Sequence, residues 1–255
     1  MKEQIDWITS AQANKYIYER LAEALQPEGF TEYAPLAGTL ARAREHHIQM
    51  VSQEIRDGET VLRMAVVPMW TCRDCRCFGR YIRLKYDESV AYGRNNYTII
   101  AFKQKTSPRV YYKPDELAHV WDTGILPQIH TEIIDVYNRM DFEVCSQYCE
   151  EEDRAWEFWS TDSESRFFTR GYNCLWKRQY EEGKVWIEKA IAEAERYLVM
   201  LEAWGEQAAP EYLRDMENGR QILEILNRRK TGWEEKVRDR LDQLEKAVLE
   251  KKFDR

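Results

Sequence analysis

A cluster of cysteines is the part of this sequence whose residue types are best suited to chemistry. Cys72, Cys75 and Cys77 lie in a short connection between two predicted strands. A Cys-x-x-Cys turn can direct two thiolates at one zinc ion, and a thiol two residues later can join them. His46 or His47 is a candidate for the fourth ligand. The alternative is a strand connection whose cysteines are small, partly buried residues that hold no metal.

Two further cysteines offer another way to complete this site. Cys145 and Cys149 are four residues apart, about one helical turn, so both thiols can face the same direction. A four-thiolate site of Cys72, Cys75, Cys145 and Cys149 would bind zinc and join the two halves of the chain. The sequence suggests no cofactor other than this candidate zinc ion.

Basic residues are concentrated between residues 73 and 113. This stretch holds ten basic and three acidic residues, a net charge of +7, within a chain whose net charge is −7, so the remainder carries −14. Cations interleaved with aromatic rings on a sheet can bind single-stranded nucleic acid. The alternative is a solvated strand face, because lysine and arginine also protect sheet edges. The candidate surface comprises Arg76, Arg80, Tyr81, Arg83, Lys85, Lys103 and Lys105.

An acidic block follows between residues 141 and 164, with nine acidic residues and only Arg154 as a base. It can pair with the basic stretch, or it can imitate the phosphates of a nucleic acid and bind a basic partner. A tryptophan pair within the block would then supply anchors of the kind that protein interfaces use. The alternative is a solvated helix face with two core tryptophans. The candidate residues are Glu150, Glu151, Glu152, Asp153, Trp156 and Trp159.

Signatures of catalysis are weak. The sequence contains no P-loop, nucleophile elbow, His-Glu-x-x-His motif or dinucleotide-binding glycine pattern. Arg42 and His47 match the spacing found in some helical ribonucleases, but they lie on a segment predicted to be strand. We therefore expect a non-enzymatic protein, with an enzyme of unrecognised site as an alternative.

Composition limits the class of protein. The chain has 255 residues, of which 44% are hydrophobic and 33% charged, as expected of a globular protein with a charged surface. It contains no run of about 20 apolar residues, the length needed to span a bilayer, and its start lacks the apolar core of a secretory signal. Six cysteines in such a chain indicate reduced thiols or metal ligands. We expect a cytoplasmic protein without a membrane segment.

The N-terminal half shows the patterns of a helix followed by a sheet. Ile17, Leu21 and Leu25 recur at helical spacing and predict a helix over residues 10–25. Strands are predicted from Thr39 to about Glu54, over 61–67, 80–86, 96–102 and 110–112, with a tight turn at Asp57-Gly58. The apolar run over 61–67 predicts an interior strand. These strands predict an antiparallel meander, followed by two short helices separated at Gly124.

The C-terminal half is predicted to be helical. Residues 172–204 form one long helix or two in sequence, after a loop at 162–165. Pro210 begins the next helix, in which Leu213, Met216, Leu223 and Leu226 are predicted to be apolar contacts. The last helix has a coiled-coil-like stripe, which predicts an antiparallel bundle or a dimer through this helix. The stripe consists of Trp233, Val237, Leu241, Leu244 and Val248.

One short segment resembles a known family. Tyr180-Glu181-Glu182-Gly183, with Ile187 and Ala190, is similar to the second helix of a tetratricopeptide repeat over about a dozen residues. In that motif, small residues seven positions apart admit the neighbouring helix. Gly183 stands where the motif usually has alanine, and no second copy occurs at the period of the repeat. The resemblance therefore implies a close neighbouring helix, and the chain is assigned to no repeat family.

Together these patterns predict an α+β protein: an N-terminal helix, a four- to five-stranded antiparallel sheet and two short helices, followed by a C-terminal helical bundle. The predicted domains are 1–145 and 146–255. The leading interpretation is a protein-interaction module, such as an inhibitor or immunity-type binder, whose partner is another protein or a second copy of the chain. The alternative is a nucleic-acid-binding or zinc-containing module that uses the basic aromatic sheet face.

Overall fold

The computed structural model describes residues 10–33, 37–56, 59–70, 78–82, 85–86, 97–98, 118–119, 121–147 and 163–253. The chain divides into two compact units. The first, here called the sheet unit, comprises Met1–Arg42, Gln49–Ala65 and Gly79–Met140. The second, here called the helical unit, comprises Ala43–Ile48, Val66–Phe78 and Asp141–Arg255. The helical unit therefore includes two short segments from the N-terminal half of the sequence.

The N-terminal helix of the sheet unit has the predicted limits. Helix α1 spans Ser10–Leu25, and its apolar stripe of Ile17, Leu21 and Leu25 is fully buried. The 3-10 turn η1 (Gln26–Glu28) follows, and Gly29 ends it with a φ of 84°. A side chain with a Cβ rarely adopts this left-handed conformation, so glycine suits this exit.

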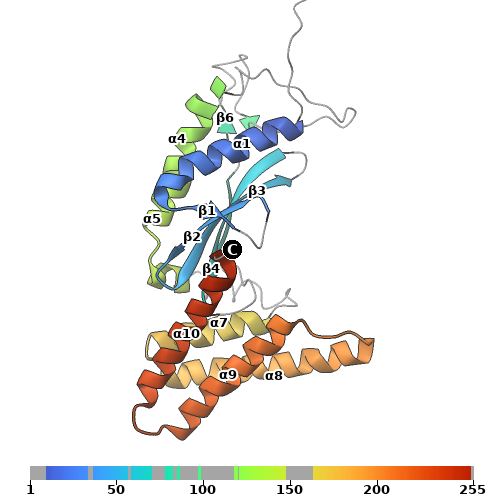
Figure 1. Cartoon of the computed structure of the whole chain (residues 1–255), viewed down its shortest axis with the longest axis vertical. Coiled ribbons are helices and arrows are strands. Elements are labelled where there is room, and N and C mark those ends of the chain that lie inside the picture. Colours follow the sequence, from blue (N-terminus) through green and yellow to red (C-terminus); the bar gives the residue numbers. More distant parts are fainter. Residues whose placement is uncertain are drawn as a thin grey trace, which may run out of the picture. The chain divides into compact units, whose positions relative to one another are not determined.

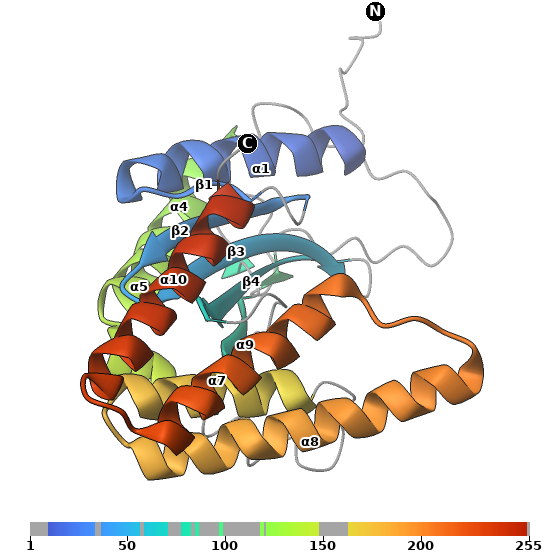
Figure 2. The ribbon, with the colours of Figure 1, turned by 60° about the horizontal axis from the view of Figure 1, so that its bottom comes forward.

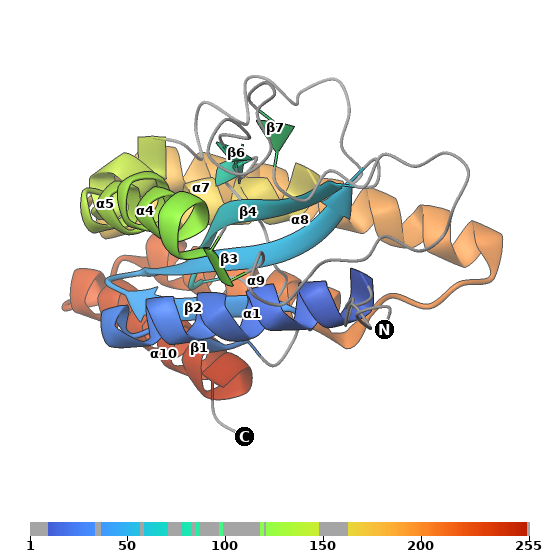
Figure 3. The same cartoon turned by 90° about the horizontal axis from the view of Figure 1, so that it is seen from above.

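The sheet is an antiparallel meander, as predicted, but the single strand predicted from Thr39 to about Glu54 is two strands with a turn at 45–46. Strands β1 (Thr31–Glu32), β2 (Thr39–Arg44), β3 (His47–Arg56), β4 (Glu59–Pro68) and β5 (Phe78–Ile82) lie in sequence order across one five-stranded sheet (Figures 1 and 3). β1 is antiparallel to β2, with Thr31 opposite Ala41. The sequence did not predict β1, because a strand of two residues is too short to show an alternating pattern. β4 lies between β3 and β5, so the prediction of an interior strand is confirmed.

The last predicted strands differ from the prediction. Residues 80–86 do not form one strand, because β5 ends at Ile82 and β6 covers only Lys85–Tyr86. β6 pairs with β7 (Tyr97–Thr98) in a separate two-stranded sheet instead of extending the meander. The alternation of polar and apolar residues gives the same pattern for one long strand and for two short ones, so it could not reveal this break. The turn at 57–58 and the strand at 110–112 lie outside the described residues.

The helical segment after the sheet is continuous where two helices were predicted. It runs through the π-helical turn η2 (Trp121–Ile125), α4 (Leu126–Ile129), η3 (His130–Ile134) and α5 (Asp135–Asn138). Gly124 lies within η2 and does not end the helix. Trp121 and Ile125 on either side of it are buried, and this packing outweighs the low helix propensity of one glycine, which is about 1 kcal/mol.

In its described residues, the helical unit contains a short helix over 142–147 and four longer ones. These are α7 (Ser163–Trp176), α8 (Tyr180–Trp204), α9 (Pro210–Arg228) and α10 (Trp233–Phe253) (Figure 2). Pro210 occupies the first turn of α9, as predicted. The predicted loop at 162–165 is wrong, because α7 begins at Ser163. Residues 172–204 were predicted to form either one long helix or two helices. The second alternative is correct, and the helices are separated at residues 177–179.

Two glycines bring α7 and α8 close together. A Cβ on Gly183 would lie 2.9 Å from the carbonyl oxygen of Gly171 and 2.6 Å from Cδ2 of Leu175. Ile187 and Ala190, the other residues of the segment that resembles a tetratricopeptide helix, are fully buried. The close neighbouring helix, which that resemblance implies, is present.

The apolar stripe of α10 is buried within the chain. Val237, Leu241 and Leu244 belong to the core of the helical unit, and Val248 is also buried. Since these side chains already have neighbours, the stripe no longer supports the prediction of a dimer through this helix. None of the described helices combines the length and the apolar character that crossing a bilayer requires.

Candidate interaction surface

The predicted zinc site falls mostly outside the described residues. The residues outside are Cys72, Cys75, Cys77 and Cys149. Cys145 lies on the short helix over residues 142–147. The Cys145 thiol is buried and is not in a disulfide, as is also true of Cys174 on α7. Among the described residues, no three His, Cys, Asp or Glu side chains are grouped as a metal site would require. Zinc binding therefore stays a prediction.

The two histidines proposed as a fourth zinc ligand have other partners. Nδ1 of His47 lies 2.7 Å from the backbone oxygen of Glu45. Nδ1 of His46 lies 2.7 Å from Oε2 of Glu245 on α10. His46 has a φ of 61°, which is uncommon for a residue with a side chain. Three rings surround it, with centroids 5.6, 5.4 and 3.8 Å away: those of Trp70, Phe142 and Trp176.

The two predicted charged surfaces also lie largely outside the described residues. Of the basic surface, Arg80 and Tyr81 are on β5 and Lys85 is on β6. The remaining basic positions lie outside: Arg76, Arg83, Lys103 and Lys105. The acidic candidates lie outside as well: Glu150, Glu151, Glu152, Asp153, Trp156 and Trp159. Nucleic-acid binding by the first surface and partner binding by the second stay predictions.

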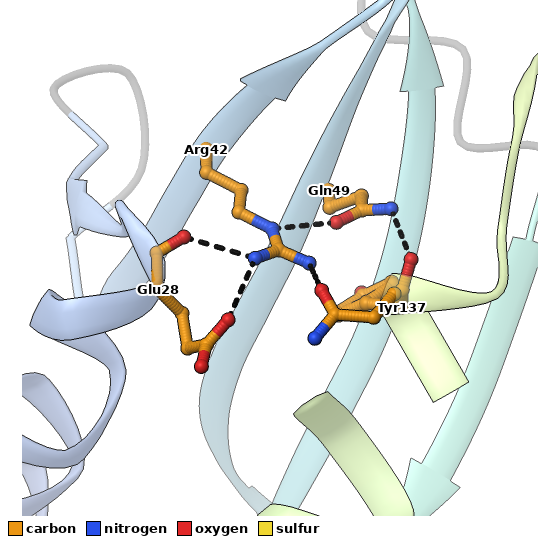
Figure 4. A network of polar contacts seen from close by, with 5 residues as sticks. Glu28, Arg42, Gln49 and Tyr137 are labelled. Atoms are coloured by element: carbon orange, nitrogen blue, oxygen red, sulfur yellow. Dashed lines mark hydrogen bonds and ion pairs between the residues drawn. The ribbon is translucent and has the colours of Figure 1, made fainter. Parts of the chain in front are cut away.

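A buried arginine on β2 is the centre of the polar network in the sheet unit (Figure 4). Nε of Arg42 donates to Oε1 of Gln49 at 2.7 Å, and Nη2 donates to Oδ1 of Asn138 at 2.7 Å. Nη1 donates to the backbone oxygen of Glu28 at 2.9 Å and lies 3.4 Å from its Oε2. The guanidinium also lies 4.7 Å from the ring centre of Phe30. Every nitrogen of Arg42 is engaged, so this arginine cross-links the fold.

Tyr137 on α5 completes the network. Its hydroxyl accepts a hydrogen bond from the amide of Ala65 at 2.9 Å, and lies 2.5 Å from the oxygen of Met50 and 3.0 Å from that of Ala65. Its own backbone oxygen accepts from Nε2 of Gln49 at 2.9 Å. Since Met50 is on β3 and Ala65 on β4, one hydroxyl bridges two neighbouring strands. Arg42 and His47 lie on strands, as predicted, and therefore not in a helical ribonuclease arrangement.

The exposed apolar side chains of the helical unit form a different kind of feature. Among the described residues, the large apolar side chains that are well exposed all come from α8 and α9. Four of the five lie between residues 195 and 213, a segment here called the arm. They are Val199 at 66%, Met200 at 42%, Trp204 at 62% and Leu213 at 49% exposure, and the fifth is Val185 at 60%.

Helix lengths explain this exposure. α8 has 25 residues and α7 only 14, and α7 packs near the start of α8 at Gly183. The start of α9 is held to α8 by the Tyr212 hydroxyl, which donates to the oxygen of Ala194 at 2.9 Å. Beyond this point the last turns of α8 run on past the start of α9, and the connection over 205–209 returns from their end (Figure 2). Because no described helix lies along the other sides of these turns, apolar residues there face solvent.

The exposed residues lie on both flanks of the arm. Met200 and Trp204 are four residues apart, so they share one side of α8. Val199 lies one turn after Glu195, and Leu213 lies two turns before Arg220 on α9. An ion pair joins Glu195 to Arg220 at 2.9 Å, so Val199 and Leu213 lie on the flank that this pair marks.

A glycine turn leaves Trp204 at the very end of α8. Gly205 has a φ of 72° and its amide donates to the oxygen of Glu202. The amide of Glu206 donates to the oxygen of Leu201 at 2.9 Å. These two bonds form a Schellman motif, which ends a helix abruptly. Trp204 is therefore presented on a defined backbone.

The arm is acidic. It contains four acidic residues and one basic residue, Arg196, for a net charge of −3. A hydrogen bond from Lys251, aided by a backbone hydrogen bond and by the charge of Lys251, holds the pKa of Glu211 below its ordinary value, so this carboxylate is ionised at neutral pH. The acidic residues are Glu195, Glu202, Glu206 and Glu211.

The sequence contained a signal for the arm that periodicity analysis did not use. The apolar residues of α8 that recur at helical spacing include Ile187, Ala190 and Leu201, and all three are buried. Val199, Met200 and Trp204 do not lie on that face, and large apolar residues away from a buried stripe are candidates for exposure. The prediction that Leu213 packs in the bundle is wrong, because it is half exposed.

The comparisons with known proteins place no family on this architecture: no family model, no curated protein and no solved structure matches the chain.

Proposed function

We propose that this chain is a non-enzymatic protein-interaction module and that the arm, residues 195–213, contacts its partner. The observation that carries the proposal is the exposure of Trp204 and Met200 at the end of α8. Tryptophan is the residue most enriched among the side chains that dominate interface energies, and methionine adapts to varied partner surfaces. Met200 and Trp204 share one side of α8, and exposed apolar side chains that lie next to each other are typical of binding sites.

The charge of the arm supports a basic partner. Its net charge of −3 surrounds apolar side chains, an arrangement complementary to an amphipathic helix with leucine on one side and lysine or arginine on the other. Opposite charges at the rim of an interface increase the association rate and the specificity. The proposed partner segment is therefore basic and amphipathic. Cys145 and Cys174 are not in disulfides, which is consistent with the cytoplasmic location proposed with this function, since that compartment keeps thiols reduced.

A calorimetric titration tests this proposal. The probe is a synthetic amphipathic peptide of about 18 residues, or five helical turns, with leucine on one face and lysine on the other. We expect it to bind the full chain, with affinity that falls as salt rises. A double variant, Met200→Ser with Trp204→Ser, is expected to weaken binding by about tenfold or more.

The control for this experiment lies on the same helix. Val185 is about as exposed as Trp204 but lies outside the arm, so Val185→Ser should leave the affinity unchanged. A second peptide with glutamate in place of lysine should bind far more weakly. Equal binding by the double variant and the Val185→Ser variant would refute the arm as the contact, and equal binding of both peptides would refute the basic partner.

A further inference from the structure

A cavity of about 200 Å³ lies within the helical unit between α9 and α10. α9 contributes Arg214 and Asn218, and α10 contributes Arg240, Gln243 and Lys251. Trp70, which follows β4, forms part of the wall together with apolar side chains of α10. Among the described residues, three cationic side chains line this cavity and no carboxylate does, which distinguishes it from the acidic arm.

Arg240, the central cation of the cavity, has no carboxylate partner in the described part of the chain. Nη2 of Arg240 donates to Oδ1 of Asn218 at 2.7 Å, and Nη1 donates to Oε1 of Gln243 at 3.1 Å. Both acceptors are neutral amides, so they orient the guanidinium without cancelling its charge. Lys251 pairs with Glu211 at 3.0 Å at the edge of the arm. Arg214 is exposed and adds a third positive charge.

Two residues of the cavity wall carry buried donors that have no acceptor in the described part of the chain. These donors are the indole Nε1 of Trp70 and Nε of Arg240. Buried polar groups in native structures are nearly always paired, so an unpaired donor beside a cavity points to a missing acceptor. An oxygen-rich ligand is the kind of molecule that supplies one.

The wall formed by Trp70 is rigid. This side chain is 1% exposed, and its ring centre lies 5.6 Å from that of His46, 5.5 Å from that of Phe142 and 5.8 Å from that of Trp176. His46 is itself held by Glu245 at 2.7 Å. A flat, fixed aromatic wall beside a set of cations suits a ligand with an apolar part and a charged part.

We propose that this cavity binds a small organic phosphate monoester, with the phosphate held by Arg240, Arg214 and Lys251 and the organic group placed against Trp70. Because Lys251 is already paired with Glu211, Arg214 and Arg240 supply the two positive charges that balance a phosphate dianion better than a single carboxylate, and the planar fork of arginine matches two phosphate oxygens. The volume of about 200 Å³ limits the organic group to a small one. This site is separate from the function proposed for the arm, and either can fail without the other.

Calorimetry on the full chain with phenyl phosphate tests the site, with inorganic phosphate and benzoate as comparison ligands. We expect phenyl phosphate to bind, inorganic phosphate to bind more weakly, and benzoate to bind weakest. Arg214→Gln and Arg240→Gln are each expected to reduce the affinity for phenyl phosphate by about tenfold or more, because each removes one charge from the phosphate.

The matched control is Arg228→Gln, which removes a charge from the same helix as Arg214 but outside the cavity. Arg214 has no hydrogen-bond or ion-pair partner among the described residues, so its replacement leaves the fold intact. A thermal melt verifies that Arg214→Gln and Arg240→Gln are folded. Retained binding in Arg228→Gln together with loss in the cavity variants supports the site. Absence of binding by the unmodified chain, or equal affinity in all variants, would overturn it.

Discussion

Two arginines, one in each unit, show how differently the sheet unit and the helical unit treat a partly or fully buried cation. Arg42 is 2% exposed, and all three of its nitrogens are hydrogen-bonded, including to Glu28. Arg240 is held by two neutral amides, its Nε has no partner among the described residues, and it borders a cavity. A saturated network stabilises a fold, whereas unused donors beside a cavity can bind something else.

The same contrast extends to apolar side chains. The large apolar residues that are well exposed in the described part of the chain belong to the helical unit, and most lie on the arm. In the sheet unit, the side chains of Met50, Val51, Leu62 and Met64 are fully buried. Exposed apolar surface is unfavourable for an isolated protein. Its location in the helical unit supports the proposal that this unit contacts a partner.

Arg42→Met should have the largest effect on stability. The substitution keeps an apolar side chain of similar length but leaves the buried Gln49 and the partly buried Glu28 without their donors. We expect a loss of about 2–4 kcal/mol in the free energy of unfolding, measured by urea denaturation. Arg240→Gln, measured alongside, should cost less than about 1 kcal/mol, because no carboxylate depends on it. Equal losses in the two variants would remove the distinction between the arginines.

Tyr137→Phe tests the same network with a single atom. It removes the hydroxyl that bridges β3 and β4 and leaves the amide of Ala65 without a partner. Leaving a buried donor unpaired costs about 1–3 kcal/mol, so a loss in that range is expected by urea denaturation. An unchanged free energy of unfolding would show that β3 and β4 move together and form a direct hydrogen bond in place of the one to the Tyr137 hydroxyl.

Gly183→Ala tests the helical core, where the helical unit is as tightly closed as the sheet unit. Alanine favours a helix, but its Cβ would lie 2.9 Å from the oxygen of Gly171, a backbone atom. Overpacking a tight contact costs about 1–3 kcal/mol, so we expect a net loss of stability in thermal melts. Val185→Ala on the exposed side of α8 should have little effect. A stabilised Gly183→Ala variant would mean that α7 and α8 are not in close contact.

Glu211→Gln should have the smallest effect. The pKa of Glu211 is lowered, chiefly by the hydrogen bond from Lys251. A lowered pKa in the folded state means that the pair contributes stability at neutral pH, and that this contribution is lost as the pH falls from about 4.5 through the lowered value. The pair is exposed and solvent weakens it. Thermal melts should therefore show a slight loss for Glu211→Gln at neutral pH and none in acid.

The sequence predicted the elements better than their edges. Helix α1 and strand β4 followed from strong apolar patterns, because apolar residues at a fixed spacing leave one arrangement that buries them. The pattern over residues 39–54 was weaker, and it did not reveal that β2 and β3 are separate strands. Gly124 was misjudged because local propensity does not include the packing of Trp121 and Ile125. The Arg42 network was out of reach of sequence analysis, since its members lie on four separate elements that only the folded chain brings together.

The arm was not among the predicted surfaces. The tryptophan anchors predicted among acidic residues at Trp156 and Trp159 lie outside the described residues and stay a prediction, and the described structure shows another exposed tryptophan among acidic residues, Trp204. Exposure depends on α8 being longer than α7, and helix limits are the least certain part of a sequence-based prediction. The cavity at Trp70 joins residues more than a hundred positions apart, so no local pattern predicted it.

Hydrogen exchange of the full chain, with and without the basic amphipathic peptide, tests most directly whether binding belongs to the helical unit. Slower exchange of backbone amides over 195–213 on adding the peptide, with β3 and β4 unchanged, is the predicted result. Protection confined to strands of the sheet unit, or none at any position despite measured binding, would contradict it.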